Sequence, residues 1–186
     1  MKILESISQY VKIDDEIRQF INQFGSEKHL SKGEVLSSHN SVDHNLYFLE
    51  KGLLRSFYFE NGKDLTANFY KEGNLIANKN TIFLNQSDDN NIDAIEPSLV
   101  TYFNYSKLEE LCENSLALAN FSRRVLGVLL ANMEKRVHSL QHMTAKEKYQ
   151  ELLTEHPDIL LRAPLGMIAS YLGISQETLS RIRSSI

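Results

Sequence analysis

The sequence predicts an α+β fold with three consecutive parts: an N-terminal antiparallel β-roll over residues 1–114, a long dimerisation helix over 115–142 and a helix-turn-helix over 143–186. The roll is predicted because residues 30–105 contain many short β-forming runs with turn signals between them, which is typical of antiparallel rolls and barrels. The helical parts are predicted because apolar residues recur at helical spacing from Ser106 onward.

The strand predictions depend on tight turns as much as on β-forming residues. Lys51-Gly52 separates two such runs, and Asn61-Gly62 is a strong hairpin signal because both central residues of a type I′ turn need a positive φ. After that hairpin, apolar and polar residues alternate from Leu65 to Tyr70, so this strand should have two distinct faces. The expected strands are 46–49, 53–59, 65–70, 92–95 and 99–103, with a turn at Gly73 and a polar loop over 85–91.

Two amphipathic helices are expected outside the roll. The first runs from Tyr10 to Phe24 and ends near Gly25. The second covers about 115–142 and has an apolar seam at spacings of three and four. We expect this seam to form a dimer interface, because so long a helix has more seam than a compact roll can cover; packing on its own roll is the alternative. The seam residues are Leu126, Leu129, Met133, Val137 and Leu140.

A hinge is expected at Met143-Thr144, where the third part begins. Thr144 can cap the next helix, with Glu147 as its capping-box partner three residues on. That helix carries Tyr149, Leu152 and Leu153 and should stop before Pro157, because the residue before a proline disfavours the helical conformation.

Residues 163–186 have the pattern of two short helices joined by a glycine turn. Pro164 suits the first turn of one helix, and Gly173 can adopt the left-handed conformation that ends it. Ser175 is a good N-cap for the second helix. The expected buried residues are Ile168, Ala169 and Leu172 on the first helix, Ile174 at the corner, and Leu179 and Ile182 on the second.

The exposed face of the second helix predicts DNA binding. Arg can bind guanine through two hydrogen bonds, Glu can accept from cytosine and Gln can pair with adenine. Hydroxyl groups can bind phosphates and so position the protein. The expected DNA-binding residues are Ser175, Gln176, Glu177, Thr178, Arg181 and Arg183. The alternative is an ordinary helical hairpin whose polar face is only solvated.

The charge and composition of the chain limit the classes of function that are expected for it. The formal net charge of −4 argues against a uniformly basic coat, but residues 1–122 carry −7 and residues 123–186 carry +3, which favours a DNA-facing C-terminal part. The N-terminus lacks the apolar stretch of a signal peptide, and no apolar run is long enough to cross a bilayer. We therefore expect a cytoplasmic protein without a membrane partner. Cys112, the single cysteine, is expected to pack as a small hydrophobe.

An enzyme is a weaker hypothesis. Rolls of this kind resemble cupins, which can hold metals on histidines, and His29, His39 and His44 lie in the half of the chain that is expected to form the roll. A metal site wants convergent ligands such as a His-x-His pair, and no such pair is present; nor is a Ser/His/Asp or Cys/His grouping evident. We expect no catalytic residues, no metal and no cofactor. A third hypothesis is a ligand-sensing module whose helix-turn-helix no longer binds DNA.

The chain resembles the cyclic-AMP receptor/fumarate-nitrate regulator (Crp/Fnr) family of bacterial transcription factors. The resemblance runs from about Lys32 to Ile186 and includes Lys32-Gly33-Glu34-Val35-Leu36, Leu46-Tyr47-Phe48-Leu49-Glu50-Lys51-Gly52, Asn61-Gly62-Lys63, Gly73 and Tyr105. Its most specific part is Ser175-Gln176-Glu177-Thr178-Leu179-Ser180-Arg181. It implies a cyclic-nucleotide-binding-domain-like roll that senses a small ligand, and Gln176, Glu177 and Arg181 facing DNA bases.

The resemblance also implies the partners. They are double-stranded DNA with a palindromic operator and a second copy of the chain through 115–142, with a small-molecule effector and RNA polymerase as further candidates. Cyclic-nucleotide members hold the ribose with a Gly-Glu pair and the phosphate with an Arg-Ser or Arg-Thr pair. Here the corresponding effector-pocket positions read Ala77-Asn78 and Asp88-Asp89, and Arg is absent from 56–122. Carboxylates would repel a phosphate, so an effector other than cAMP is expected.

The other departure is at the end of the chain. The family commonly adds a β-wing after the second helix, whereas here the residues stop at Ile186. We expect affinity for DNA to depend on the dimer and on Arg181 and Arg183 in place of wing contacts.

Overall fold

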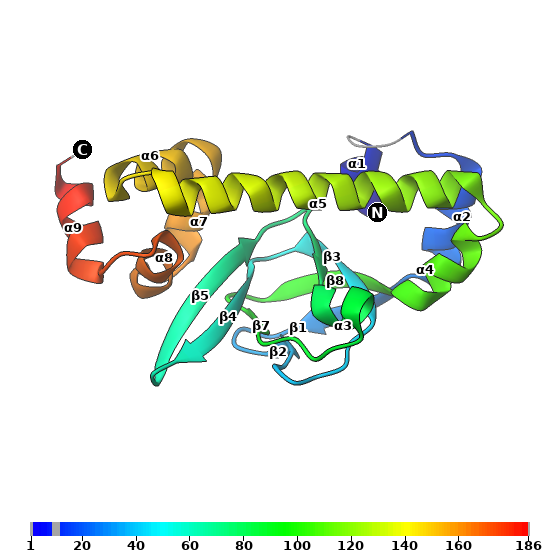
Figure 1. The fold of residues 1–186 in the computed structure, drawn as a ribbon, viewed down its shortest axis with the longest axis horizontal. Helices are drawn as coiled ribbons and strands as arrows, with labels where there is room; N and C mark the ends of the chain where they lie inside the picture. Colours follow the sequence, from blue (N-terminus) through cyan, green and yellow to red (C-terminus); the bar gives the residue numbers. More distant parts are fainter. Residues whose placement is uncertain (1, 9–11, 186) are drawn as a thin grey trace.

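The computed structural model describes residues 2–8 and 12–185, which form a β-roll with one long helix along its side and a group of short helices at one end (Figure 1). The roll is made of two four-stranded antiparallel sheets, in the orders β1-β8-β3-β6 and β2-β7-β4-β5. The strands are β1 (Ser26–Leu30), β2 (Val35–Ser37), β3 (Asn45–Lys51), β4 (Leu54–Glu60), β5 (Lys63–Tyr70), β6 (Leu75–Ala77), β7 (Asn91–Ala94) and β8 (Ser98–Asn104). The predicted roll is therefore confirmed.

The turns occur where the sequence predicted them. Asn61 and Gly62 have φ values of 51° and 75°, as a type I′ hairpin between β4 and β5 requires. Gly52 has a φ of 105°, and a Cβ at this position would lie 2.1 Å from the Oγ of Ser98. The turn between β3 and β4 therefore accepts glycine only, because any side chain would collide with the start of β8.

Short helices flank the roll. The helix predicted from Tyr10 to Phe24 starts later, as α2 (Asp15–Phe24), because the Asp14 carboxylate caps it by accepting from the Ile17 amide at 3.0 Å; Tyr10 and Val11 lie outside the described residues. Two further helices were not predicted from the sequence, α1 (Lys2–Ser8) and α3 (Lys79–Leu84), which lies between β6 and β7. After β8 comes α4 (Tyr105–Cys112), whose Cys112 is partly buried and packs against the core.

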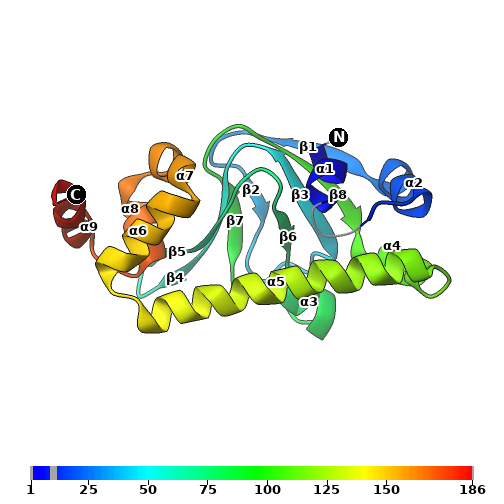
Figure 2. The ribbon, with the colours of Figure 1, turned by 90° about the horizontal axis from the view of Figure 1, so that it is seen from above.

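The predicted long helix is α5 (Leu116–His142), which begins after Ser115 as N-cap. Its inner side packs on the roll through Leu118, Phe121 and Val125. Leu129 packs against the same core cluster, whereas the rest of the predicted seam is exposed, with 37% of Leu126 and 49% of Met133 accessible. Leu130, which the predicted seam did not include, is 68% exposed. Figure 2 shows α5 running along one edge of the molecule with its outer side uncovered. None of the described helices is apolar enough over a sufficient length to span a membrane.

The last part of the chain contains α6 (Ala145–Glu155), α7 (Pro157–Arg162), α8 (Leu165–Leu172) and α9 (Gln176–Ser184). The predicted capping box is present, with Thr144 and Glu147 bonded reciprocally. Pro164 was expected in the first turn of α8 but is its N-cap residue, with ψ at 143°, so the helix begins one residue later. The helix α7 was not predicted, because its six residues are too few to show a helical period.

The C-terminal helices pack directly on the roll. A shared apolar cluster joins Leu53 and Ile95 of the roll to buried residues of α6–α9, among them Leu152, Ile168 and Leu179. A hydrogen bond at the edge of β5 adds to this contact, since the Thr66 amide donates to the Ser170 Oγ of α8 at 2.8 Å. The division into parts at 114, 142 and 143 remains a prediction, but the last part is not a separate body on a linker.

Candidate functional site

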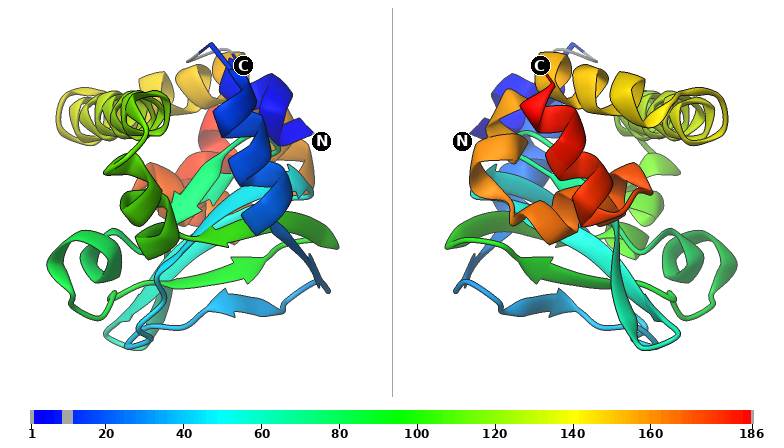
Figure 3. Two further views of the ribbon diagram at one scale, coloured as in Figure 1. Left: turned by 90° about the vertical axis from the view of Figure 1, so that its right-hand side faces the viewer. Right: turned by 90° about the vertical axis from the view of Figure 1, so that its left-hand side faces the viewer.

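The candidate site is the pair α8 and α9 at one end of the molecule, where the right-hand view of Figure 3 shows α9 in front. Gly173 ends α8 in the left-handed conformation, with φ at 69° and ψ at 35°. The amides of Gly173 and Ile174 donate to the carbonyls of Ser170 and Ala169, which closes the turn. Ser175 then caps α9 by accepting from the Thr178 amide at 3.2 Å. These local predictions are confirmed.

The two sides of α9 differ in the way that the sequence predicted. Leu179 is fully buried against α8 and α6, and Ile182 is partly buried beside it. Gln176, Glu177, Arg181 and Arg183 are exposed, with Glu177 and Arg181 facing away from Leu179 and Gln176 and Arg183 flanking it. Such a helix can present charged and amide groups to a partner without disturbing its own packing.

Contacts within the hairpin position two of these side chains. The Arg181 guanidinium donates to the Thr178 hydroxyl at 3.4 Å. Gln176 lies close to Gly166 of α8, since a Cβ at Gly166 would be 3.0 Å from the Gln176 Nε2. Hydrogen bonds from its own backbone and from Ser175 lower the pKa of Glu177, which therefore carries a negative charge at neutral pH. The face is thus of mixed charge, not a uniformly basic patch.

An ion cluster holds the C-terminal helices to the roll. Arg162 at the end of α7 bonds Glu96 at 2.6 Å and Glu72 at 2.9 Å, and Asp158 at 3.2 Å. Glu72 also accepts from the Gly52 amide at 2.9 Å, so Arg162 ties together three turns of the roll. Burial alone would raise the pKa of Glu72, but hydrogen bonds from Arg162 and backbone amides lower it overall. This cluster was not predicted from the sequence.

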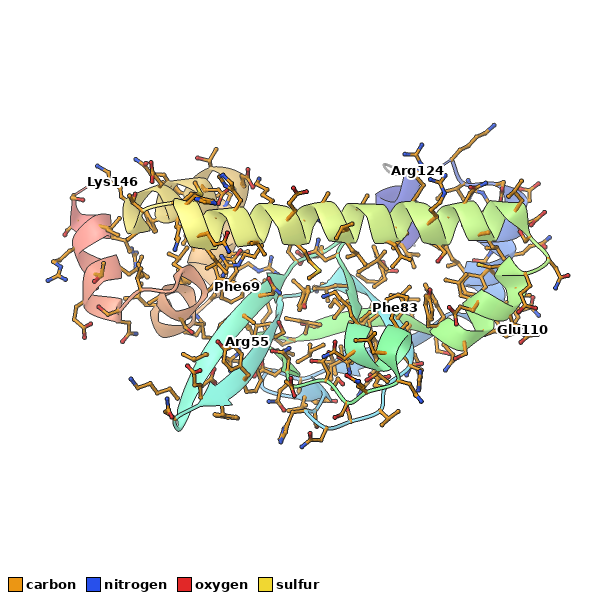
Figure 4. The ribbon with its side chains drawn as sticks, viewed as in Figure 1. Arg55, Phe69, Phe83, Glu110, Arg124 and Lys146 are labelled. Carbon is orange, nitrogen blue, oxygen red and sulfur yellow. The ribbon has the colours of Figure 1, made fainter. Side chains whose placement is uncertain are left out.

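A second contact joins α8 to α5. The Arg136 guanidinium lies 3.8 Å from the ring centroid of Tyr171 and donates to the Tyr171 carbonyl. On its other side Tyr171 packs against Phe69 of β5, with ring centroids 5.2 Å apart. Tyr171 therefore contacts both α5 and β5, so the orientation of α8 and α9 depends on the positions of these two elements. Figure 4 shows Phe69 on β5 below the C-terminal half of α5.

His156 lies between α6 and α7, and its surroundings indicate that the stability of this packing depends on pH. Burial and the nearby Lys71 lower its pKa below the ordinary value of 6.5, although Glu155 and Asp158 oppose this and Lys135 adds to it. The unfolded chain therefore binds the proton more tightly, so the stability that neutral His156 contributes is complete above about pH 6.5 and falls as pH drops toward the lowered pKa. When the pH is lowered from 7.5 to 5.5, we expect the melting temperature of His156→Gln to fall by less than that of the wild type. Equal decreases in the two proteins would contradict this role of His156.

The predicted effector-pocket residues do not converge on one cavity. Asn78 is buried and donates to the Ser37 Oγ at 2.7 Å, while the buried Asp88 accepts from the amide and side chain of Asn90 at 2.9 and 3.0 Å. Asp89 is exposed. Ala77 lines an apolar cavity of about 140 Å³ beneath α3 and a larger one beside α5, and the other three residues line neither of these two.

The histidines considered for a metal site do not gather either. His29 and His39 are exposed, and the His39 ring bonds Asn91 at 3.1 Å. Within residues 2–8 and 12–185, no group of three or more His, Cys, Asp or Glu side chains has the arrangement of a metal site.

Comparison with known proteins assigns the roll. Residues 27–115 match the family model of the cyclic nucleotide-binding domain. No curated protein matches the chain by sequence. Among solved structures, FixK2 from Bradyrhizobium japonicum is similar at 21% identity and a TM-score of 0.75, covering 87% of this chain and 83% of FixK2.

Two further structures extend the likeness. A CooA mutant from Carboxydothermus hydrogenoformans is 18% identical, with a TM-score of 0.67 and coverage of 95% of this chain and 86% of CooA. The c-di-GMP-responsive global regulator CLP from Xanthomonas campestris is 13% identical, with a TM-score of 0.70 and coverage of 92% and 91%. Residues 27–115 therefore match the cyclic nucleotide-binding domain, and the chain as a whole has the same fold as these three solved structures.

Proposed function

We propose that this chain is a cytoplasmic transcription regulator that binds a palindromic DNA operator as a homodimer, with α8 and α9 as its helix-turn-helix. The observation that carries the proposal is α9 itself, which exposes Gln176, Glu177, Arg181 and Arg183 while Leu179 is buried beneath them. These exposed groups match the donors and acceptors of base edges in the major groove. The shared fold with CLP, a regulator of gene expression, supports the same assignment.

The dimer is proposed to form through the exposed side of α5. Two such copies would place their α9 helices in successive major grooves about 34 Å apart, which is why the operator should be palindromic. Exposed Phe83 of α3 lines one apolar pocket together with Leu126, Leu130 and Met133 of α5, so the uncovered surface extends beyond the helix.

The roll is proposed to respond to an effector other than cAMP and to have no catalytic activity. Asp88 and Asp89 carry negative charge at the positions where the resemblance places the partners of a cyclic phosphate, and like charges would repel it. RNA polymerase remains a proposed partner.

The experiment that tests DNA binding is selection from a random pool of duplex DNA with the purified protein at low salt, followed by sequencing. We expect enrichment of an inverted repeat. Absence of any enrichment, both alone and with a cell metabolite extract, would favour the other hypothesis, a sensing module that no longer binds DNA.

Arg181→Ala is expected to weaken binding to the selected operator by about 1–3 kcal/mol, because the guanidinium would lose its two hydrogen bonds to a guanine. The measurement is an equilibrium titration of fluorescent operator at fixed salt. Arg124→Ala is the matched control, since Arg124 is exposed on α5 near the end remote from α9 (Figure 4). Equal affinities of the Arg181→Ala variant and the wild type would exclude α9 as the recognition helix.

A further inference from the structure

A cleft of about 560 Å³ lies between α5, the β5–β6 turn and the C-terminal helices. Its floor is formed by β5 and β6, one wall by α5 between Val125 and Ser139, and the other wall by α6, α7 and α8. We call it the α5–α6 cleft. Of the four residues expected to bind an effector, only Ala77 lines it, so it is a different site.

The charge of this cleft is opposite to that of the protein. Two acidic side chains line it, Glu151 and Glu155, against five basic ones, an excess of three positive charges in a chain whose net charge is −4. The basic residues are Lys71, Lys79, Lys135, Arg136 and Lys148. Such a concentration of one sign in a cleft with low-dielectric walls attracts small ions of the other sign.

Most of this positive charge is not neutralised within the protein. Lys135 pairs with Glu155 and, at 3.8 Å, with Glu151, which uses both acidic groups of the cleft. Within the described part of the chain, Lys71 and Lys79 have neither an ion pair nor a hydrogen bond from their side chains. The cations left over are therefore available to a ligand.

Arg136 is the most telling of these cations. Its side chain is partly buried, and the Glu151 carboxylate attracts it without forming an ion pair with it. Among the described residues, one of its five N–H donors is used, on the Tyr171 carbonyl. Burial lowers the pKa of its guanidinium, which reports the cost of placing that charge away from water. A bound anion would offset this cost by accepting from the remaining donors.

Apolar and aromatic residues make up much of the remaining lining, beside the polar Asn68, Asn74, Asn132, Ser139 and His156. Leu75, Val128, Leu129 and Met133 lie on the β6 and α5 sides, and Tyr70 and Tyr171 also line the cleft. The cleft therefore has an apolar part and a cationic part, and its volume lies within the range of sites for small organic molecules.

We propose that the α5–α6 cleft binds a small organic anion, an apolar ring or chain that carries a phosphate, sulfonate or carboxylate group. Arg136 and Lys71 bind the anionic group, and the side chains of α5 and β6 contact the apolar body. Because the cleft is formed by the roll, α5 and the C-terminal helices together, its occupant stabilises their packing. Binding does not require that α9 contacts DNA.

The test uses two fluorescent probes with the same rings, 8-anilinonaphthalene-1-sulfonate and the uncharged N-phenyl-1-naphthylamine. We expect the wild type to bind the sulfonate at least about tenfold more tightly than the neutral probe, the effect of one charge-assisted hydrogen-bonded contact. Arg136→Gln and the double variant Lys71→Gln/Lys79→Gln should each abolish this preference. The double variant serves as a second test because neither lysine side chain has an ion pair or a hydrogen bond within the described residues, whereas Arg136→Gln also removes the stacking on Tyr171.

Lys146→Gln is the matched control, because Lys146 is exposed on α6 and does not line the cleft. It should leave both affinities unchanged. Competition then identifies the anionic group: adenosine 5′-monophosphate tests a phosphate on an aromatic body and decanoate a carboxylate on a chain, and displacement of the sulfonate probe by either supports the site. Equal binding of the two probes, or an unchanged preference in the double variant, would overturn the proposal and assign probe binding to the exposed side of α5.

Discussion

Leu130→Glu is expected to convert the proposed dimer into a monomer and to weaken binding to a palindromic operator by about 10²–10⁴-fold. The size of the effect follows from multivalency, because a monomer binds one half-site without the high effective concentration that a second linked module provides. In a dimer of two-fold symmetry each interface residue occurs twice, so one substitution places two carboxylates in an apolar contact. The 68% exposure of Leu130 in the single chain means that the fold itself should tolerate the change.

The mass is to be measured by sedimentation or light scattering, and the affinity on full and half operators. Affinity for a single half-site should stay the same, which separates loss of the dimer from damage to α9. His138→Glu is the control, since it adds the same carboxylate at an exposed position of α5 away from the apolar seam. A Leu130→Glu protein that remains a dimer would show that the copies associate through another surface.

Arg55→Met should lower the free energy of unfolding by about 3–5 kcal/mol, the usual cost of removing one partner of a buried ion pair. Arg55 is 4% exposed on β4. Its guanidinium bonds Asp64 at 2.6 and 2.7 Å, and Asp93 at 3.0 Å; it also donates to the Thr66 hydroxyl at 3.0 Å. One arginine thus joins β4 to both of its neighbours, β5 and β7. Figure 4 places it on this sheet, below the C-terminal helices.

Denaturant unfolding measures this effect, and a double variant tests its cause. Arg55→Met/Asp93→Asn should regain part of the loss, because the largely buried Asp93 would no longer be an unpaired charge. Lys63→Met, at the exposed start of β5, should change stability by no more than about 0.5 kcal/mol. If Arg55→Met were as stable as Lys63→Met, the ion pairs of Arg55 with Asp64 and Asp93 would contribute nothing to the stability of the fold.

What the sequence could predict was local. The Asn61-Gly62 hairpin, the Thr144–Glu147 capping box and the left-handed Gly173 each depend on the conformational preferences of two to four neighbouring residues, and all three are present. The positions of β3, β4, β5, β7 and β8 along the chain and the start of α5 followed from the same kind of signal. The strands β1, β2 and β6, and the order of the strands within the two sheets, were not predicted. Short helices such as α7 escaped because they are less than two turns long.

The contacts between distant segments could not be predicted. Arg162 meets Glu96 across 66 residues and Glu72 across 90, and nothing in the composition around Arg162 distinguishes it from a solvated helix end. Arg55 likewise looks like an ordinary strand residue in the sequence, because Asp64 and Asp93 lie beside it only in the folded chain. The α5–α6 cleft depends on such pairings too, since its walls come from separate parts of the chain.

The apolar cluster that Leu53 and Ile95 share with α6–α9 has a consequence for how the protein unfolds. Two modules that merely sit on a common linker melt independently, whereas modules that share a core lose it together. We expect guanidinium denaturation to give one cooperative transition, with far-ultraviolet circular dichroism and tyrosine fluorescence coinciding, and an m-value set by the surface of the whole chain. The variant Leu53→Phe places a larger side chain at this junction, and overpacking there would weaken the contact between the roll and the C-terminal helices before either loses its own core. We therefore expect circular dichroism and tyrosine fluorescence to change in two successive steps in this variant.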